Sequence, residues 1–480
     1  MNAIPPMWGW RGATGGRAGH VAAGVEYQGT SVQLCGLFPF VAGSGSPTLG
    51  IPVGRHMLFG EPVCLDPLLW ADAGLVTNPG MFVLGQPGVG KSALVKRLLT
   101  GSVAFGRTAL IVGDTKPDYT RIVEHLGGQV IRVGRGLDRI NPLDSGPLGT
   151  ALRRLPAAAA DQLRLEIRGR RLALLLALCT LVRGTRIHNA EEVLLGRVID
   201  LLSDRLPRDP TIPDVLALLE EGPDELRSAA RIGGEADYRA RAADLVPTLA
   251  LLCDGTLRGV FDGPTTTPID LDAPAVSVDI SRIALAGDQL VAAAMLSVWS
   301  FGFATVDATA ALADAGLAPR RQWLAVMDEL WRALRGAPGL VDHADALTRL
   351  NRQRGVASLM ITHSLDDLEA LPTQEDRAKA RGFVERSAIV VLAALSAREL
   401  ERVSLITRLS APERELVASW ASPDVLRPGI RHPGRGRYLI KTGEGPGLPV
   451  TLTLVDEELR LYDTDAAIRQ ITRSSFGRDT

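Results

Sequence analysis

Short apolar runs alternate with longer segments of helical periodicity along most of this chain. The clearest run, Met81–Leu84, predicts a buried strand, and apolar residues then recur at helical spacing from Ala93 to Leu99. A long helix is expected over Gln289–Thr305. Further buried strands are expected at Thr108–Val112, Gln129–Val133, Ala275–Ile280, Trp323–Met327, Val356–Thr362 and Ile389–Leu395. Strands that alternate with helices predict an α/β fold with a mostly parallel sheet covered by helices on both faces.

One long region departs from this alternation. From about Gly149 to Leu252 the chain is rich in Leu, Ala and Arg, has helical periodicity and contains few strand formers, which predicts an inserted all-helical subdomain. Its most membrane-like stretch, Leu172–Val182, has about half the length of a membrane span and is flanked by arginines. We therefore expect a buried helix there, no transmembrane segment, and at most a peripheral association with membranes.

The two ends of the chain carry β-like patterns. Short runs such as Ser31–Leu34 lie between Val21 and Trp70 and predict a small N-terminal β module. Tyr438–Lys441 and Val450–Val455 flank a glycine-rich turn, which predicts a β-hairpin. The changes in pattern divide the chain into a β-rich lead-in (1–75), a first core part (76–148), a helical insertion (149–265), a second core part (266–456) and a tail (457–480).

Composition narrows the classes of function. A net charge of −1 argues against a basic nucleic-acid coat, although a local basic channel stays possible, and the arginines of the helical region alternate with acids as on solvated helix faces. The four cysteines are far apart, which fits a reducing compartment and argues against a structural zinc or disulfides. The N-terminus has no long apolar run, so we expect no signal peptide.

The loop between the strand Met81–Leu84 and the following helix has the spacing G-x-x-x-x-G-K-S. In this context the glycines let backbone N–H groups surround the β- and γ-phosphates of a nucleotide, and the helix N-terminus faces the same anion. Lys91 would neutralise phosphate charge and Ser92 would hold Mg²⁺. The chain has only five lysines, against 48 arginines, which adds weight to this one. The expected ATP-binding residues are Gly85, Gln86, Pro87, Gly88, Val89, Gly90, Lys91, Ser92 and Ala93.

An acidic pair follows another predicted strand. Asp328 and Glu329 come directly after Trp323–Met327, at the carboxyl end where α/β sheets bind ligands. We expect Asp328 to hold Mg²⁺ through water and Glu329 to orient or deprotonate the attacking water. Taken alone, the pair would fit an acidic helix N-terminus equally well. The phosphate-binding loop Gly85–Ser92 upstream, hereafter the P-loop, favours the catalytic interpretation.

Two further polar residues sit at strand ends. His363 follows Val356–Thr362 and is interpreted as a sensor of the γ-phosphate, the alternative being a surface histidine that starts the next helix. Lys116, in the segment Asp114–Tyr119, could face phosphate or a partner subunit, or belong to a polar turn at Pro117-Asp118. The sequence leaves these interpretations of Lys116 equally open.

Together these pieces resemble the TraC/TrbE-like cytoplasmic ATPases of conjugative type IV secretion systems, within the HerA/FtsK superfamily of P-loop motors. The motifs that carry the resemblance, in chain order, are GQPGVGKS, D-x-K-x-acid-Tyr, Asn-Pro-Leu-Asp, Gly-Val-Phe-Asp-Gly and Asp-Glu-Leu-Trp. The resemblance covers about residues 25 to 455 and implies a RecA-like core. It also implies ATP and Mg²⁺ as cofactors, and an oligomer, often a hexamer, at the inner face of the plasma membrane. Its partners would be inner-membrane secretion-channel subunits, with DNA or protein as substrate.

The resemblance also assigns an arginine and exposes departures. The segment Arg352–Gly355 matches a superfamily motif that supplies an arginine finger to the neighbouring subunit, which points to Arg352, with Arg354 as the second choice. From the residues alone, a basic helix end would be the simpler interpretation. His363 stands where the family usually has glutamine, so turnover could be slow or pH-sensitive. Few residues precede the P-loop, so we expect the lead-in to be the remnant of a larger docking domain, with docking supplied by a partner chain or achieved differently.

Three functions remain open on sequence grounds. The first is an ATPase that powers secretion or conjugation, and the second is a DNA translocase or coupling-type DNA pump of the same superfamily. The third is a structural subunit that binds nucleotide and turns it over little. An ABC transporter ATPase is disfavoured because no LSGGQ-like signature occurs, and a GTPase because no N-K-x-D motif occurs.

Overall fold

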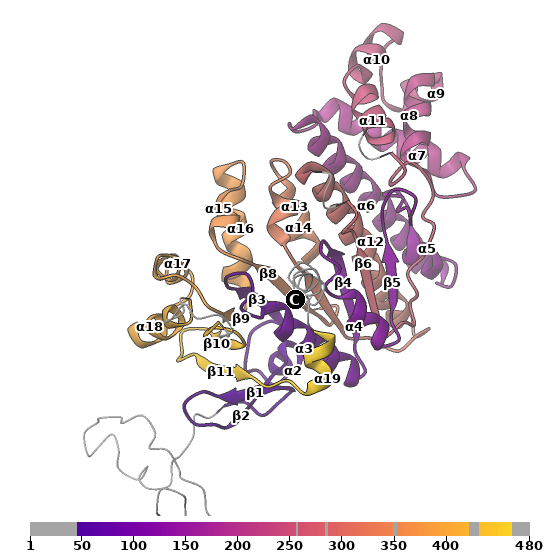
Figure 1. Cartoon of the computed structure of the whole chain (residues 1–480). Coiled ribbons are helices and arrows are strands. Elements are labelled where there is room, and N and C mark those ends of the chain that lie inside the picture. Colours follow the sequence, from indigo (N-terminus) through magenta and orange to yellow (C-terminus); the bar gives the residue numbers. More distant parts are fainter. Residues whose placement is uncertain (1–45, 256–257, 284–286, 349–352, 422–431, 463–480) are drawn as a thin grey trace, which may run out of the picture.

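A computed structural model of the chain describes residues 46–255, 258–283, 287–348, 353–421 and 432–462. Within these residues one mixed sheet contains eleven strands, in the order β2-β1-β11-β10-β9-β3-β8-β7-β4-β6-β5 (Figure 1). The strands are β1 (Ile51–His56), β2 (Pro62–Leu65), β3 (Gly80–Leu84), β4 (Thr108–Asp114), β5 (Gln129–Arg132), β6 (Ala275–Asp279), β7 (Trp323–Met327), β8 (Val356–Thr362), β9 (Ile389–Leu392), β10 (Arg437–Thr442) and β11 (Leu448–Leu452).

The sheet has a parallel core and an antiparallel extension. Strands β9-β3-β8-β7-β4-β6-β5 pair in parallel, whereas β10, β11, β1 and β2 continue the sheet from β9 in antiparallel pairs. All seven residues of β4 are buried, as expected for a parallel strand covered on both faces. The predicted strands and hairpin are confirmed, with β9 ending at Leu392 rather than Leu395. The run Ser31–Leu34 lies outside the described residues.

The helices connect the parallel strands and cover the sheet. They are α2 (Pro67–Asp72), α3 (Lys91–Ala104), α4 (Thr120–His125), α5 (Gly146–Leu152), α6 (Ala157–Arg183), α7 (Asn189–Arg205), α8 (Ile212–Glu221), α9 (Asp224–Ala229), α10 (Glu235–Ala242), α11 (Leu245–Asp254), α12 (Asp288–Asp314), α13 (Leu330–Leu334), α14 (Leu340–Thr348), α15 (Asp366–Glu369), α16 (Gln374–Arg386), α17 (Ala397–Val403), α18 (Ala411–Ser419) and α19 (Asp456–Leu461). The fold is therefore a mostly parallel α/β sheet, as predicted.

The helical region projects from the sheet. Figure 1 shows α7–α11 gathered beyond α6, on the side of the molecule away from β1 and β2. The Asn-Pro-Leu-Asp segment ties this region to the core: the Asn141 side-chain amide donates to the Pro210 carbonyl, and the Ser145 amide and hydroxyl donate to Asp209. These bonds join the residues that follow β5 to the segment just before α8. The division of the chain into five segments stays a prediction.

The most apolar long helix is α12, not the stretch Leu172–Val182 within α6. In the described part of the chain, α12 alone is long and apolar enough to cross a membrane, and 89% of its apolar window is buried inside the protein. It packs between β4 on one side and α5 and α6 on the other. Trp299 fixes it to the sheet, because its indole N–H donates to the Val112 carbonyl at 3.0 Å. The burial of α12 on two sides accounts for its apolar composition.

We expect opposite effects from two glycine-to-alanine changes in helices. Alanine favours helix by about 1 kcal/mol over glycine, but a Cβ on Gly101 of α3 would lie 2.4–3.1 Å from three side-chain atoms of Ile51 on β1. Overpacking of that kind costs about 1–3 kcal/mol, so Gly101→Ala should lower the free energy of unfolding. Gly169→Ala on α6 meets no atom within 4 Å and should raise it. Urea denaturation of both variants checks the pair, and a stabilised Gly101→Ala would contradict the close packing of α3 on β1.

Candidate nucleotide-binding and catalytic site

The glycine-rich loop joins β3 to α3 as predicted. Gly90 is the N-cap of α3 and has φ 99°, and Gly88 has φ 80°, two conformations that side chains with a Cβ rarely adopt. Gly85 is restricted differently, because a Cβ there would lie 2.6 Å from the Ala393 Cβ. Pro87 and Gly88 are exposed, whereas Val89 is buried. The loop thus has the backbone shape that directs N–H groups toward an anion at the start of α3.

Residues far away in the sequence hold this loop in place. The backbone N–H of Gln86 donates to the Ala394 carbonyl at 2.9 Å, and the backbone N–H of Gly436 donates to the Val89 carbonyl at 2.9 Å. The Tyr438 hydroxyl donates to the Gly90 carbonyl at 2.6 Å. These partners follow β9 or belong to the start of β10, so the sheet on that side of β3 fixes the loop before any ligand binds.

Lys91 lies at the centre of the site, with its ammonium group turned toward the loop. The side chain is buried, and Nζ donates to the carbonyls of Gly85 at 2.5 Å and Gln86 at 3.0 Å. Burial lowers the pKa of Lys91 to about 8, although the negative charges of Asp328 and Glu329 act to raise it. The loop carbonyls therefore stabilise a lysine whose positive charge burial disfavours.

The acidic pair leaves the sheet directly after β7. Glu329 has φ 54° and ψ 36°, a left-handed conformation that is uncommon for any residue with a side chain. Arg231 is the other residue of this kind in the described part of the chain. Such strain costs about 1–3 kcal/mol and concentrates at functional sites. The Glu329 side chain contacts His363, which directly follows β8.

Three donors surround the Glu329 carboxylate. Its Oε1 accepts hydrogen bonds from His363 Nε2 at 2.9 Å and from Lys116 Nζ at 3.1 Å, and its Oε2 accepts from Trp331 Nε1 at 2.6 Å. Burial raises the pKa of Glu329, but the hydrogen bonds from His363 and Lys116, together with the charge of Lys116, outweigh it and lower the pKa to about 2. The group is therefore an ionised carboxylate at neutral pH.

Asp328 has the opposite electrostatic setting. Its Oδ2 accepts a hydrogen bond from the Tyr119 hydroxyl at 2.9 Å, and its Oδ1 accepts from the Glu329 amide at 2.9 Å. Burial and the neighbouring Glu329 charge raise the pKa of Asp328 to about 6. In the absence of a cation the site therefore disfavours the ionised form of Asp328.

His363 connects the two halves of the site. Its Nδ1 lies 2.9 Å from Lys91 Nζ and its Nε2 lies 2.9 Å from Glu329 Oε1. Because an ammonium group can only donate, we assign a neutral imidazole that accepts at Nδ1 and donates from Nε2. The order β3-β8-β7 explains the position, since His363 follows β8 and β8 lies between the other two strands.

Other predicted residues stand apart from this hydrogen-bonded group. Ser92 lies half-buried in the first turn of α3, next to Lys91. Arg352 lies outside the described residues. Arg354 forms an ion pair with Asp307 of α12, which Arg170 of α6 also contacts.

Sequence reasoning assigned no role to Tyr119 and Trp331. Both stand in motifs that the sequence analysis singled out, D-x-K-x-acid-Tyr and Asp-Glu-Leu-Trp, and these motifs were the available signal. Their donor groups contact Asp328 and Glu329 only because the loop after β4 and the first turn of α13 meet at the same sheet edge.

The donor set fits magnesium held jointly with a phosphate. In the described residues no group of three or more His, Cys, Asp or Glu side chains could hold a metal by itself. Mg²⁺ is usually bound by one or two protein oxygens together with phosphate oxygens and waters. The Ser92 hydroxyl and the Asp328 carboxylate are oxygen ligands of that kind.

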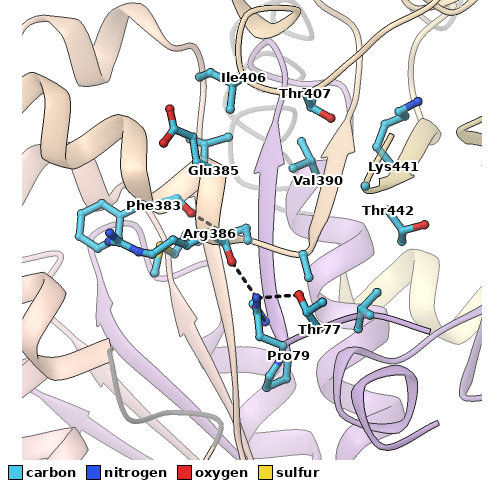
Figure 2. A pocket seen from close by; sticks show the side chains of 18 of the residues that line it. Thr77, Pro79, Phe383, Glu385, Arg386, Val390, Ile406, Thr407, Lys441 and Thr442 are labelled. Carbon is cyan, nitrogen blue, oxygen red and sulfur yellow. Dashed lines mark hydrogen bonds between the residues drawn. The ribbon is translucent and has the colours of Figure 1, made fainter. Parts of the chain in front are cut away.

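A separate cavity of about 810 Å³ lies at the opposite end of β3. It opens beside Gly80, where β3 begins, whereas the P-loop follows Leu84, where the strand ends. Figure 2 shows Thr77, Arg386 and Lys441 around it, and the Asn78 side chain donates to the Arg386 carbonyl at 2.9 Å. Acidic and basic side chains are mixed along its walls, so it lacks the convergent positive charge of a phosphate site.

Comparison with known proteins defines the fold. No protein-family model matches the sequence, and no curated protein matches it. The solved structure of VirB4 of Thermoanaerobacter pseudethanolicus is similar, with 20% identity and a TM-score of 0.64 over 87% of this chain and 99% of that one. This chain shares its fold with VirB4. The bacterial conjugative coupling protein TrwB, in a structure with sulphate, matches with 11% identity and a TM-score of 0.51 over 86% of this chain and 91% of that one. The predicted fold class, a RecA-like α/β fold with a mostly parallel sheet, is thereby confirmed.

We expect Asp328→Asn to stabilise the protein without nucleotide. The pKa of Asp328 is about 6 in the folded chain and 3.8 ordinarily, so ionisation of Asp328 lowers the free energy of unfolding. The full loss is reached above pH 6, and the free energy of unfolding is recovered as pH falls below 3.8. The variant should gain about 1–3 kcal/mol at pH 8 and almost nothing near pH 4. Urea denaturation in EDTA measures the gain. Asp161→Asn, at an exposed ion pair of α6, is the control and should change little at either pH.

Proposed function

We propose that this chain binds ATP with Mg²⁺ and hydrolyses it as a subunit of an oligomeric motor that powers type IV secretion or conjugative transfer. One observation carries the proposal: His363 bridges Lys91 of the P-loop and Glu329 of the acidic pair, at 2.9 Å on each side. A P-loop lysine and an acidic pair that share one hydrogen-bonded group support joint action on the same phosphate.

The P-loop residues would bind and orient the nucleotide. The amides of residues 85–93 would surround the β- and γ-phosphates, and Lys91 would exchange the Gly85 and Gln86 carbonyls for phosphate oxygens. Ser92 and Asp328 would hold Mg²⁺, which would neutralise charge on the transferred phosphoryl group. The exchange would stabilise the positive charge of the buried Lys91, because a dianionic phosphate carries more negative charge than two carbonyl groups.

Glu329 would act on the attacking water once its present donors move. A carboxylate with a pKa of about 2 is a poor base, because a general base works best with a pKa near the working pH. Lys116 has a 62% exposed side chain and can turn toward phosphate. If Lys116 and His363 moved away from Oε1, the interactions that lower the pKa of Glu329 would be lost. The pKa would then rise, because burial raises it. Nucleotide binding would thus convert a restrained carboxylate into a more basic one.

The assembly and its setting are inferred from resemblance. The sequence motifs resemble cytoplasmic conjugation ATPases, and the fold matches VirB4 more closely than TrwB, with TM-scores of 0.64 and 0.51. We therefore favour a homo-oligomer, often a hexamer in such motors, on the cytoplasmic face of the inner membrane and bound to secretion-channel subunits. Arg352 would reach the phosphates of a neighbouring subunit. Arg354 suits that task less, because Asp307 of its own chain holds it.

The fold of the coupling protein TrwB keeps a DNA pump as the second candidate function. DNA separates the two, since a translocase couples turnover to the strand that it moves. A DNA motor couples its ATPase cycle to contacts with DNA phosphates. A secretion ATPase lacks that coupling, so we expect steady-state ATP hydrolysis to change less than about twofold on addition of single- or double-stranded DNA. Strong stimulation by either form of DNA would favour the pump.

Two substitutions at the site should separate binding from hydrolysis. Lys91→Ala should weaken ATP binding about 10- to 100-fold, because it removes charge-assisted hydrogen bonds to phosphate. Glu329→Gln should bind ATP normally and lower the hydrolysis rate by about 10² to 10⁴. Fluorescent-ATP titration and phosphate release measure the two effects.

Matched controls come from one exposed pair on α16. Lys379 and Glu375 form an i,i+4 ion pair, so Lys379→Ala and Glu375→Gln make the same chemical changes on the surface. Both should bind and hydrolyse ATP as the wild type does. ATP bound without measurable turnover in the wild type would instead indicate a nucleotide-binding structural subunit. Wild-type turnover in Glu329→Gln would remove Glu329 from the mechanism.

A further inference from the structure

Each carboxylate of the acidic pair has one aromatic hydrogen-bond donor. The Tyr119 hydroxyl donates to Asp328 Oδ2 at 2.9 Å, and the Trp331 indole N–H donates to Glu329 Oε2 at 2.6 Å. The two donors come from different elements, Tyr119 from the loop before α4 and Trp331 from the first turn of α13. The remaining question is whether they only satisfy buried polar groups or set the geometry of the site.

Tyr119 is fixed on several sides. Its side chain is fully buried, and its backbone amide donates to Asp114 Oδ2 at 3.0 Å. The buried ammonium of Lys96, on α3, lies 5.8 Å from the centre of its ring. These contacts restrain the phenol, whose hydroxyl in turn contacts Oδ2 of Asp328. Since Oδ1 is held by the Glu329 amide, the plane of the Asp328 carboxylate is determined at both oxygens.

Trp331 restrains the other carboxylate in a different way. Its indole N–H is only a hydrogen-bond donor, so its partner Oε2 of Glu329 must be an acceptor. The guanidinium of Arg335, one turn later, lies 5.1 Å from the ring centre. The donors to Oε1, by contrast, are His363, which also contacts Lys91 of the P-loop, and Lys116, whose side chain is 62% exposed. The donor to Oε2 is thus independent of the P-loop, whereas one donor to Oε1 is in contact with it.

We propose that Tyr119 and Trp331 are positioning residues, Tyr119 orienting Asp328 toward Mg²⁺ and Trp331 orienting Glu329 so that Oε1 faces the attacking water. This inference rests on the proposed function. It divides the work between the two aromatic residues: loss of the phenol hydroxyl should affect the magnesium requirement, and loss of the indole N–H should affect the rate of hydrolysis.

The first test is a Mg²⁺ titration of the binding of a non-hydrolysable fluorescent ATP analogue. Tyr119→Phe keeps the ring and removes the hydroxyl, so the Mg²⁺ concentration for half-maximal binding should rise about tenfold while binding in EDTA stays unchanged. Tyr238→Phe is the matched control, because Tyr238 is also buried and donates to the Leu219 carbonyl at 2.6 Å in the helical region. It should leave the titration unchanged even if it lowers stability.

The second test compares kcat with KM. Trp331→Phe should lower kcat about tenfold with KM and the Mg²⁺ titration unchanged, and should cause no further loss when combined with Glu329→Gln. Trp70→Phe is its control, since Trp70 is buried and its indole N–H donates to the Leu49 carbonyl at 2.9 Å. It should keep the wild-type kcat.

The outcomes separate this inference from the function on which it rests. If the wild type shows no Mg²⁺-dependent binding, the proposed function is wrong and the positioning roles are wrong with it. If the wild type binds but Tyr119→Phe follows the wild-type titration, or Tyr238→Phe shifts it equally, Tyr119 does not position Asp328. A wild-type kcat in Trp331→Phe, or an additive loss with Glu329→Gln, overturns the role of Trp331.

Discussion

The hydrogen-bonded group Lys91–His363–Glu329 depends on one constraint, the placement of β8 between β3 and β7 in a parallel sheet. Parallel pairing brings the carboxyl ends of these strands to one edge, at a spacing that an imidazole ring can bridge. The P-loop follows β3, the histidine follows β8 and the acidic pair follows β7. If the strands were ordered differently, the same residues would be correct in type and too far apart to interact.

The electrostatics of the site follow from this placement. Burial alone would neutralise the charged groups, lowering the pKa of Lys91 and raising that of both acids. Hydrogen bonds from His363 and Lys116 lower the pKa of Glu329 to about 2. The hydrogen bonds that Asp328 accepts from Tyr119 and the Glu329 amide do not offset burial, so its pKa is about 6, and the pKa of Lys91 is about 8. The left-handed backbone of Glu329 adds strain to the same few residues. The site is therefore arranged at a cost in stability that a phosphate and a cation would offset.

The rest of the molecule restrains this edge from outside. The antiparallel strand β10 holds the P-loop through Tyr438, and α12 covers β4 through Trp299. The Asn-Pro-Leu-Asp segment, which had no assigned chemistry, fixes the helical region to the core through Asn141. The length and apolar composition of α12 are already visible in the sequence, whereas its burial against a sheet strand and two other helices is a property of the fold.

The local elements were predictable from the sequence because they depend on near neighbours. Apolar periodicity defined the strands β3, β7 and β8, and the glycine spacing defined the P-loop, since both reflect backbone conformation over a few residues. The contacts between elements were decided by the tertiary structure alone. Lys91 meets His363 across 272 residues of sequence, and Tyr119 meets Asp328 across 209. A hydrogen bond requires two atoms within about 3 Å, and no pattern within a single segment specifies which distant segment the folded sheet will bring that close.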